Sequence, residues 1–425
     1  MTQTTIAPWL ADSRWPTVPI RLVAKLGSGH TPSRSKPEYW EDCTVPWFTL
    51  ADVWQIRNTG LSVVSETKEK ISHLGLANSA AVLHPADTVI LSRTASVGFS
   101  AIMGKPMATS QDFATWRCGP KLIPQFLLHA LRGMTPDLKR VATGSTHKTI
   151  YMPDIEQLHI PLPSIEEQRH IASYLDAETS RIEQLLATRR SQISILENRE
   201  ASIIAAKLSD TIASDTRVKF LVSRLTSGPR GWGELVADHG SPFLRITNIP
   251  RSGISLDLRD LLRVDAPEGP ERERTRTRAG DVLVSITADI GSIAVVNTDM
   301  QDANVSQHIA LLRPRLDRCF PQWLAYALKS ARSRQQLATS SYGGTKVGLG
   351  LSQVADVAVP SISLEAQKKA AMAIDVGLAR NSNLANTLID QIRLLTERRQ
   401  ALITAAVTGQ FDISTASGRN ITQGV

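Results

Sequence analysis

The amino-acid sequence contains one segment twice, and this internal duplication restricts the possible folds more than any other feature. The stretch STHKTIYMPDIEQLHIPLPSIEEQ, which begins at Ser145, aligns without a gap with GTKVGLGLSQVADVAVPSISLEAQ, which begins at Gly344. The same alignment continues downstream, where it pairs Pro161 with Pro360, Gln168 with Gln367, Asp176 with Asp375 and Arg199 with Arg398. The 425 residues therefore form two copies of one module, each long enough to bury its own core.

Weaker repeats lie upstream in the same order. PADTVILSRTASVG from Pro85 resembles RAGDVLVSITADIG from Arg278, and TSQDFATWRC resembles VSQHIALLRP. Runs of β-branched residues bounded by Gly, Pro or Asp predict short strands, among them VPWFTLADV, DTVILS, FLRITNI and DVLVSIT. PQFLLHALRG and PQWLAYALKS predict a short amphipathic helix in each copy. We therefore expect an α+β fold in which each copy has a mixed, curved β-sheet.

Each copy ends in a segment that predicts a long helix. Pro161 and Pro163 end the preceding strand, and Ser164 with Glu167 forms a Ser-x-x-Glu capping box. The second copy keeps the cap at Ser363 but has Ala366 at the position of Glu167. Hydrophobic residues then recur at three-four spacing, interrupted at inward positions by Arg189, Glu200, Asn381 and Arg399.

This spacing predicts two helices of about 45 residues, each about 65 Å long, that pack antiparallel as a coiled coil. Polar residues in such a seam usually fix register and the choice of partner. The alternative is that each helix only covers its own globular region. The unusual length and regularity of both segments favour the paired arrangement.

Composition excludes several classes of protein. Hydrophobic residues make up 42% and charged residues 21%, and no apolar run is long enough to span a bilayer. No export signal begins the sequence, so we expect a cytoplasmic protein. The three cysteines are far apart, which supports neither a disulfide framework nor a zinc site. A net charge of +8 would attract a polyanion but is too small to prove one.

Motifs for catalysis are absent from the sequence. It has no H-E-x-x-H, no G-x-S-x-G, no Walker-type phosphate loop and no G-x-G-x-x-G after a strand. The histidines are scattered, so we expect no metal site. The lack of motifs together with the duplication favours a reader or scaffold over an enzyme.

The order of these motifs resembles the specificity subunit of type I restriction-modification systems. The resemblance covers nearly the whole chain, and its most specific parts are the two helix starts (Pro161 to Gln168, Pro360 to Gln367) and AVTGQFD from Ala406. It implies two target-recognition domains that each read half of a bipartite site in double-stranded DNA. It also implies helices that bind two modification (methyltransferase) subunits and recruit restriction subunits, which carry S-adenosylmethionine, ATP and Mg; this chain itself is expected to hold no cofactor.

The resemblance implies the following division. Target-recognition domain 1 is residues 1–162, helical spacer 1 is 163–210, target-recognition domain 2 is 211–361, helical spacer 2 is 362–410, and 411–425 is a tail. The fold is then two tandem domains with mixed sheets, separated by two long antiparallel coiled-coil helices with internal pseudo-twofold symmetry. Because the two copies differ in sequence within one frame, the two DNA half-sites should differ as well.

Candidate DNA contacts come from loops and strand ends with side chains able to bind phosphates or base edges. They are Arg93, Thr94, Thr146, His147, Lys148, Arg245, Asn248, Thr287, Thr345 and Lys346. For these residues a purely structural role is about as common as a DNA contact. For Arg93, exposure to solvent without any DNA contact is the commoner explanation. The run ERERTRTR, from Glu271, is better explained as a solvated surface than as a DNA patch.

Candidate partner contacts follow from the resemblance and lie at the helix starts: Glu166, Gln168, Ile171, Glu365 and Gln367. Ala370 and Ala373 replace Ile171 and Tyr174 of the first copy, so the second helix start is expected to hold its modification subunit differently. Two other functions stay open. A stand-alone DNA-modifying enzyme would show turnover by itself, and a structural coiled-coil adaptor would form complexes without sequence-selective DNA binding.

Overall fold

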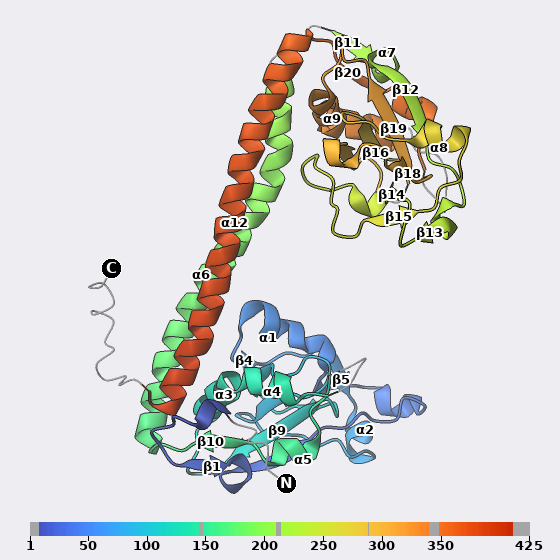
Figure 1. Ribbon diagram of the computed structural model, residues 1–425. Coiled ribbons are helices and arrows are strands. Elements are labelled where there is room, and N and C mark those ends of the chain that lie inside the picture. The colour runs from blue at the N-terminus through green and yellow to red at the C-terminus, as the bar shows by residue number, and fades with distance from the viewer. Residues whose placement is uncertain (1–7, 144–147, 210–213, 288, 340–347, 411–425) are drawn as a thin grey trace, which may run out of the picture. The chain divides into compact units, whose positions relative to one another are not determined.

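The computed structural model describes residues 8–143, 148–209, 214–287, 289–339 and 348–410, and it divides the chain into two compact units. Unit 1 is formed by residues 1–190 and 390–425, and unit 2 by residues 191–389. Two helices of 45 residues, α6 (Ile165–Ser209) and α12 (Leu364–Thr408), each contribute one half to each unit (Figure 1).

The sequence around Ser164 explains why α6 begins there. The Ser164 hydroxyl accepts from the Glu167 N–H at 3.2 Å, and the Glu167 carboxylate accepts from the Ser164 N–H at 3.0 Å. This N–H lowers the pKa of the Glu167 carboxyl. In the second copy only the first half of this box exists, because Ser363 accepts from the Ala366 N–H at 3.3 Å. The predicted capping box is confirmed in its geometry.

The two long helices pair antiparallel within each unit. In unit 1, Arg399 forms an ion pair with Glu183, and Ile171 shares a hydrophobic core with Val407. In unit 2 the helices are also antiparallel, because residues later in α6 contact residues earlier in α12. Asn381 donates to the Leu196 main-chain oxygen at 2.8 Å, and a Cβ at Gly377 would lie 3.0 Å from the Ile203 side chain.

The paired helices also cover the globular parts, so the two arrangements considered from sequence coexist. In unit 1, Leu175 of α6 and Ile403 of α12 belong to the same core as Leu127 of the globular region. In unit 2, Ile204 and Ile374 belong to the core that contains Trp323. Each unit is therefore a globular region packed on two half-helices.

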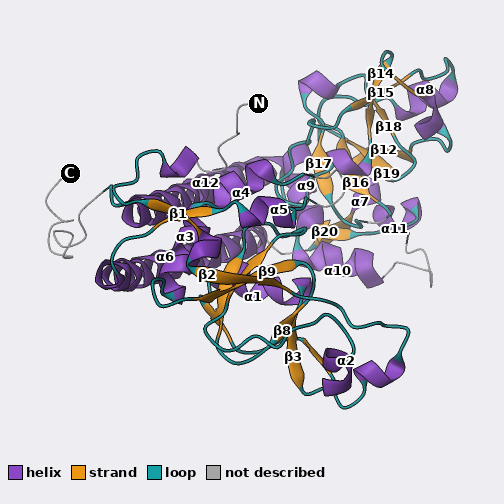
Figure 2. Ribbon diagram, turned by 90° about the horizontal axis from the view of Figure 1, so that it is seen from below, coloured by secondary structure: helices purple, strands orange, loops and turns teal. Residues whose placement is uncertain are grey.

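The described residues of unit 1 form three sheets. The largest has the order β2 (Ala24–Ser28), β9 (Phe113–Cys118), β6 (Val89–Ser92), β7 (Ser100–Met103), β4 (Val63–Val64). The second has the order β5 (Glu69–Ile71), β3 (Val45–Phe48), β8 (Ala108–Thr109), and the third pairs β1 (Thr17–Pro19) with β10 (His159–Pro161). Its short helices are α1 (Val53–Thr59), α2 (His73–Ala77), α3 (Pro124–Gly133), α4 (Thr135–Val141) and α5 (Met152–Glu156). Figure 2 shows β3, β8 and α2 together at the end of unit 1 away from α6.

Unit 2 repeats this plan. Its sheets have the orders β12 (Val222–Ser227), β19 (Ile309–Pro314), β16 (Val282–Ser285), β17 (Ile293–Val295); β13 (Val236–Ala237), β15 (Leu262–Val264), β14 (Ser241–Leu244), β18 (Asn304–Val305); and β11 (Asp215–Arg217), β20 (Ala358–Pro360). Its short helices are α7 (Val218–Leu221), α8 (Pro270–Thr275), α9 (Pro321–Lys329), α10 (Ala331–Thr339) and α11 (Leu351–Ala355).

Unusual details of the fold are duplicated too. In both units a strand of the second sheet pairs parallel with a two-residue strand: β3 with β8, and β14 with β18. A glycine passes close to each of these short strands. A Cβ at Gly29 would lie 2.0 Å from the Thr109 main-chain oxygen, and one at Gly228 would lie 2.0 Å from that of Val305. Only glycine fits at such a close approach.

A polar contact joins the core helix of each globular region to the long helix beside it. His129 of α3 lies 2.8 Å from Asp176 of α6, and the Tyr326 hydroxyl of α9 donates to Asp375 of α12. His129 is fully buried, and burial lowers its pKa although Asp176 acts in the opposite direction.

Two predicted strands are shorter than expected: in VPWFTLADV the strand ends at Phe48 and Leu50–Asp52 form a 3-10 turn. FLRITNI was expected to be a strand, but β14 ends at Leu244 and Ile246–Asn248 form a 3-10 turn. The Asn248 side-chain oxygen accepts from the Arg245 N–H at 2.9 Å, which stabilises the turn against the extended conformation. Within the described part of the chain, no helix is both long and apolar enough to cross a membrane.

Candidate nucleic-acid interface

The same edge of each unit collects three segments of the chain. The first follows a buried strand, β6 in unit 1 and β16 in unit 2. The hydroxyl of Ser92 donates to the Thr94 main-chain oxygen at 3.3 Å, and that of Ser285 donates to the Thr287 oxygen at 3.0 Å. These matching turns place the predicted residues Arg93, Thr94 and Thr287 at corresponding positions.

The second segment is the end of the duplicated loop before the helix start. In unit 1, the Ala95 N–H donates to the Lys148 main-chain oxygen at 2.9 Å, and Ile150 donates to Arg93 at 2.8 Å. In unit 2, Leu349 donates to Ile286 at 2.8 Å. Lys148 is exposed, and its main-chain contact with Ala95 places it next to the turn that carries Arg93 and Thr94. The other predicted loop residues, Thr146, His147, Thr345 and Lys346, lie outside the described residues.

The third segment follows the short parallel strand, and sequence reasoning did not assign it to the site. In unit 1, the Arg93 N–H donates to Asp112 and its Nε donates to the Gln111 main-chain oxygen, both at 2.9 Å. In unit 2, Thr287 Oγ1 lies 3.0 Å from His308 Nδ1. The repeat of TSQD as VSQH was visible in sequence, but only the fold shows that Gln111 and Gln307 lie at this edge.

The Arg93 side chain is held in place by main-chain oxygens. Besides Gln111, it contacts the Ile150 oxygen at 3.4 Å, and it is half-buried. This arrangement orders the guanidinium at the edge, where part of it stays accessible. The accessible part of the guanidinium could contact DNA, and the main-chain hydrogen bonds hold it in place whether or not DNA is bound.

Arg245 and Asn248 serve the structure of their own loop. Asn248 is fully buried and donates to the Asp257 oxygen at 2.9 Å, so its amide is not accessible to a base. Arg245 forms an ion pair with Asp260 at 2.7 Å, while its Nε is buried without a hydrogen-bond partner in the described part of the chain. The geometry gives Asn248 a structural role, and Arg245 lines a cavity described below.

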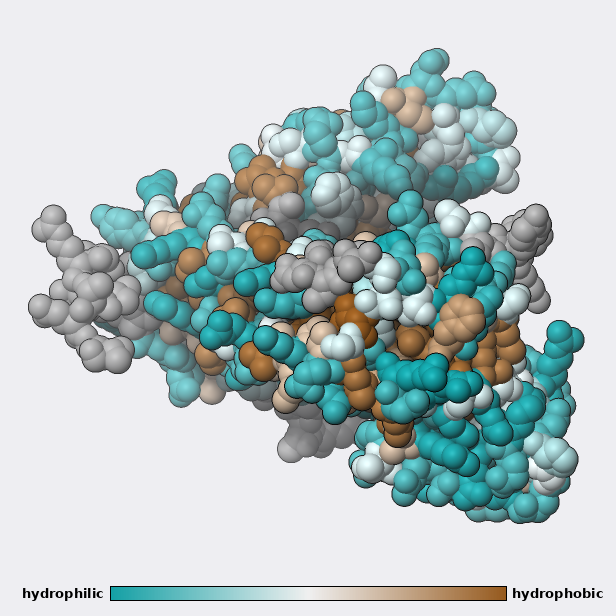
Figure 3. Space-filling model, turned by 90° about the horizontal axis from the view of Figure 1, so that it is seen from above, coloured by the Kyte–Doolittle hydropathy of each residue, from teal (hydrophilic) through white to brown (hydrophobic). Residues whose placement is uncertain are grey.

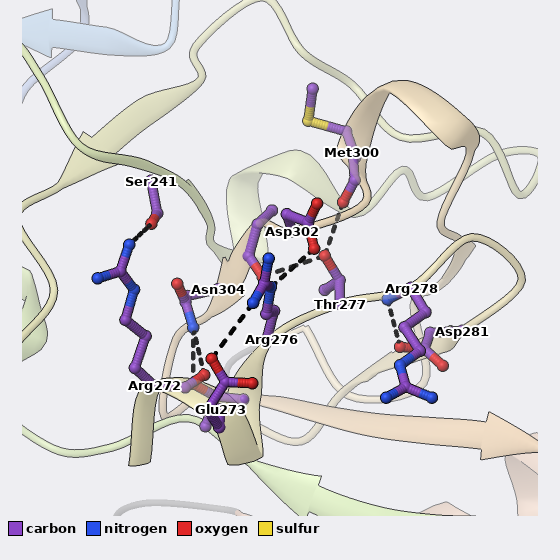
Figure 4. A network of polar contacts seen from close by, with 12 residues as sticks. Ser241, Arg272, Glu273, Arg276, Thr277, Arg278, Asp281, Met300, Asp302 and Asn304 are labelled. Carbon is purple, nitrogen blue, oxygen red and sulfur yellow. Dashed lines mark hydrogen bonds and ion pairs between the residues drawn. The ribbon is translucent and has the colours of Figure 1, made fainter. Parts of the chain in front are cut away.

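The arginine-rich run forms an intramolecular network (Figure 4). Arg276 contacts Asp302 at 2.7 Å and Glu273 at 3.2 Å, and Arg274 donates to the Ser227 oxygen at 2.7 Å. Arg272 forms an ion pair with Glu268. Neighbouring carboxylates therefore offset much of this positive charge, which agrees with the interpretation of the run as ordinary surface.

The predicted partner-contact residues divide into buried and exposed sets. Gln168 is fully buried; its Oε1 accepts from Ile123 at 3.0 Å, and its Nε2 donates to the oxygens of Lys121 and Pro163 at 2.9 and 3.0 Å. Gln367 is buried with the same three contacts, to Phe320, Arg318 and Ile362. Both amides are used inside the fold.

Ile171 is likewise buried, at 2% exposure, in the core of unit 1. Glu166 and Glu365 are exposed. Of the five predicted residues, only these two glutamates present their side chains to an outside partner.

Exposed hydrophobic residues on the long helices were not predicted. One face of the molecule, shown in Figure 3, is mainly hydrophilic, with hydrophobic side chains interrupting it in several places. Large hydrophobic residues on α12 that are more than half exposed are Met372, Val376, Ile389 and Leu394, and α6 adds Ile195. Single exposed hydrophobic residues are common on protein surfaces, but Met372 and Val376 lie one helical turn apart and present neighbouring apolar side chains.

The described residues contain no group of three or more His, Cys, Asp or Glu able to hold a metal ion. Burial raises the pKa of the Cys118 and Cys319 thiols to about 12, so neither is an activated nucleophile.

Comparison with known families and proteins agrees with the duplicated fold. Residues 12–194 match the family described as "Type I restriction modification DNA specificity domain". The type I restriction enzyme MjaIX specificity subunit of Methanocaldococcus jannaschii is 28% identical over 185 residues, 43% of this chain and 41% of that protein. The EcoBI specificity subunit of Escherichia coli is 20% identical over 314 residues, 68% of this chain and 65% of that protein. The matched stretches therefore span less than two thirds of these curated relatives.

Solved structures share the fold. A chain from a structure titled for complex assembly and conformational transition of the type I R-M system has a TM-score of 0.72 at 19% identity, with 93% of this chain and 98% of that chain covered. The HsdS subunit from Thermoanaerobacter tengcongensis has a TM-score of 0.53 at 19% identity, with 93% and 97% covered. The chain is thus similar to specificity subunits of type I restriction-modification systems in the sequence of residues 12–194 and in its duplicated fold.

Proposed function

We propose that the chain is the non-catalytic DNA sequence-specificity subunit of a type I restriction-modification complex. The observation that carries this proposal is the duplicated edge, which keeps the same turns in both units while its side chains differ. Arg93 and Asp112 in unit 1 correspond to Ile286 and His308 in unit 2. A reader of an asymmetric, bipartite site needs two such edges with one frame and different chemistry.

In this proposal, residues 1–162 and 211–361 are the two target-recognition domains, and the helical segments 163–210 and 362–410 separate them. Arg93, Thr94, Lys148 and Thr287 contribute DNA contacts at the two edges, together with Thr146, His147, Thr345 and Lys346. Lysine and arginine would bind phosphates, and polar side chains would bind base edges.

The long helices would dock two modification subunits. The exposed residues Met372 and Val376, together with Glu365, offer a mixed apolar and charged surface near the start of α12. Glu166 offers a corresponding charge at the start of α6. Methyl transfer with S-adenosylmethionine, and ATP- and Mg-dependent translocation and cleavage, would belong to the modification and restriction subunits.

Exchange of one domain tests this function. Residues 1–155 would be replaced by those of a related subunit, and methylated sites mapped by sequencing the DNA of cells that carry the parent or the chimera. One half-site should change and the other should stay, with the gap between them unchanged. A change in both half-sites, or methylation of one continuous palindrome, would refute the proposal.

The two alternatives predict different results. A coiled-coil adaptor predicts no sequence-selective binding of duplex DNA by the complex. A stand-alone enzyme predicts methylation by the purified chain with S-adenosylmethionine alone, which the proposed function excludes.

A further inference from the structure

A cavity of about 200 Å³ lies at the edge of unit 2. Its lining includes the apolar residues Pro229, Phe243 and Ile246, and also Gln307 and His308. The cavity therefore combines an apolar hollow with polar groups, as binding sites generally do.

A buried hydroxyl in this cavity is left without a partner. Ser306 also lines the cavity, is 6% exposed, and its Oγ has no hydrogen-bond partner in the described part of the chain. Its counterpart in unit 1, Ser110, donates to Asp112 at 2.9 Å. Because His308 replaces that aspartate, the Ser306 hydroxyl is left for an outside group. A buried polar group without a partner is costly, which favours a ligand that satisfies it.

Three side chains form a hydrogen-bonded row beside the cavity. Thr287 Oγ1 lies 3.0 Å from His308 Nδ1, and Gln307 Nε2 lies 3.1 Å from His308 Nε2. An amide nitrogen can only donate, so the neutral ring accepts at Nε2 and carries its hydrogen on Nδ1. The Thr287 hydroxyl hydrogen and the Gln307 Oε1 then remain for an outside partner. If the Gln307 amide is rotated by 180°, its oxygen accepts from His308 Nε2 and the Thr287 hydroxyl donates to Nδ1. The Gln307 amide group then offers the free donor and the Thr287 oxygen the free acceptor, so the row still has one of each.

We propose that Thr287, Gln307 and His308 read an A·T base pair in duplex DNA, an inference that rests on the proposed function. Adenine shows a hydrogen-bond acceptor at N7 and a donor at its amino group in the major groove, which complements one donor and one acceptor. Guanine alone shows two acceptors there, and although a G·C pair adds the cytosine amino donor, it has no methyl group. The apolar hollow of Pro229, Phe243 and Ile246 suits the methyl group of the thymine.

Unit 1 has different chemistry at the matching positions. Asp112 replaces the imidazole, and Gln111 Oε1 already accepts from the Thr31 hydroxyl at 2.6 Å. The carboxylate and the adjacent Arg93 therefore replace the neutral row. The exchanges of Asp112 for His308 and of Arg93 for Ile286 would then give two unlike half-sites within a shared Ser-Gln frame.

The experiment uses the intact complex, purified through a tag on the full-length chain, and a pool of random-sequence DNA duplexes. Bound duplexes are sequenced for the parent, His308→Asp and Gln307→Ala, with Asp112→His as the matched change in unit 1. His308 is exposed, and thermal unfolding of each variant checks that the fold is kept. Total affinity for the pool at two salt concentrations is measured alongside.

Both unit 2 variants should lower the preference for A·T over G·C at one position of one half-site, by roughly tenfold to a hundredfold. The half-site read by unit 1 should stay unchanged in these variants. Asp112→His should have the opposite effect: it should alter the half-site read by unit 1 and leave the half-site read by unit 2 unchanged. Unit 2 variants that select the parent's sequence at every position would overturn this inference alone. A parent complex that selects no bipartite sequence would overturn the proposed function as well.

Discussion

Asn381 of α12 donates a hydrogen bond to the Leu196 main-chain oxygen of α6, at 2.8 Å. A polar residue at an inward position of a helix pair favours one register, since shifting the helices would bury its amide without a partner. The contact lies within unit 2, whereas in the described residues of unit 1 the seam carries an ion pair between Arg399 and Glu183. The two halves of the helix pair are therefore fixed by different chemistry.

Replacing Asn381 by Ala should lower the free energy of unfolding by about 1 kcal/mol, because one intramolecular hydrogen bond is lost. Asn383→Ala on the exposed side of the same helix is the control and should change it by less than about 0.5 kcal/mol. Urea unfolding followed by circular dichroism measures both. Equal effects of the two substitutions would show that the contact does not stabilise the pair.

Gln168→Ala should be more costly, at about 2 kcal/mol or more, since it leaves a buried N–H and two carbonyl oxygens without partners. The matching Gln367→Ala should have a similar effect on unit 2, because its amide makes the same three contacts. Gln157→Ala, at an exposed position, serves as the control. The same unfolding measurement applies, and a neutral Gln168→Ala would mean that the helix start does not depend on the amide.

The larger features of the fold follow from the sequence because they repeat. Two long helices, their start at Ser164, and the strands β6 and β16 were all predictable from duplicated caps and hydrophobic patterns. The turn at Asn248 was not, since its stability depends on a side chain that reaches back to Arg245 and across to Asp257. Local β-propensity cannot report such a contact.

The candidate site was predictable only in part, for a related reason. Arg93, Thr94 and Thr287 follow recognisable strands, whereas Gln307 and His308 reach the edge through a parallel pairing of two residues, β14 with β18. Such short non-local pairings leave no periodic signal. Gln168 and Gln367 differ from expectation in another way. As repeated polar residues they were interpreted as partner contacts, but their amides are buried and form hydrogen bonds inside the fold.

Unit 1 should lose stability as the pH falls below about 6.5. Burial lowers the pKa of His129, so the unfolded chain binds a proton at a higher pH than the folded chain does. The contribution is complete above the unfolded value and is lost as the pH falls towards the folded one. His129→Tyr, which introduces the residue found at the equivalent position Tyr326, should reduce this pH dependence. Part of the dependence should remain, because burial also lowers the pKa of His84. Thermal unfolding between pH 5 and 8 measures the slope, with the exposed His170→Tyr as control.

Gly29→Ala and Gly228→Ala should each destabilise one unit by about 1–3 kcal/mol, because the added methyl group overlaps a main-chain oxygen of a paired strand. Gly233→Ala is the control, since a Cβ there meets no atom within 4 Å. Thermal unfolding is the measurement. Because the two glycines lie at matching positions, an effect at one without the other would contradict the equivalence of the two close approaches.

Lys148→Ala should weaken binding to all DNA duplexes equally, since an exposed cation at this edge would contact phosphate and not a base. The slope of log K against log salt concentration should become less steep by about 0.9 for one lost phosphate contact. Lys105→Ala changes the net charge by the same amount, but its ammonium group is paired with Glu66 at 2.6 Å. It should leave the slope unchanged. Fluorescence anisotropy with the intact complex at several salt concentrations distinguishes the two, because general attraction by the net charge would affect both variants alike, whereas a defined phosphate contact affects Lys148 alone.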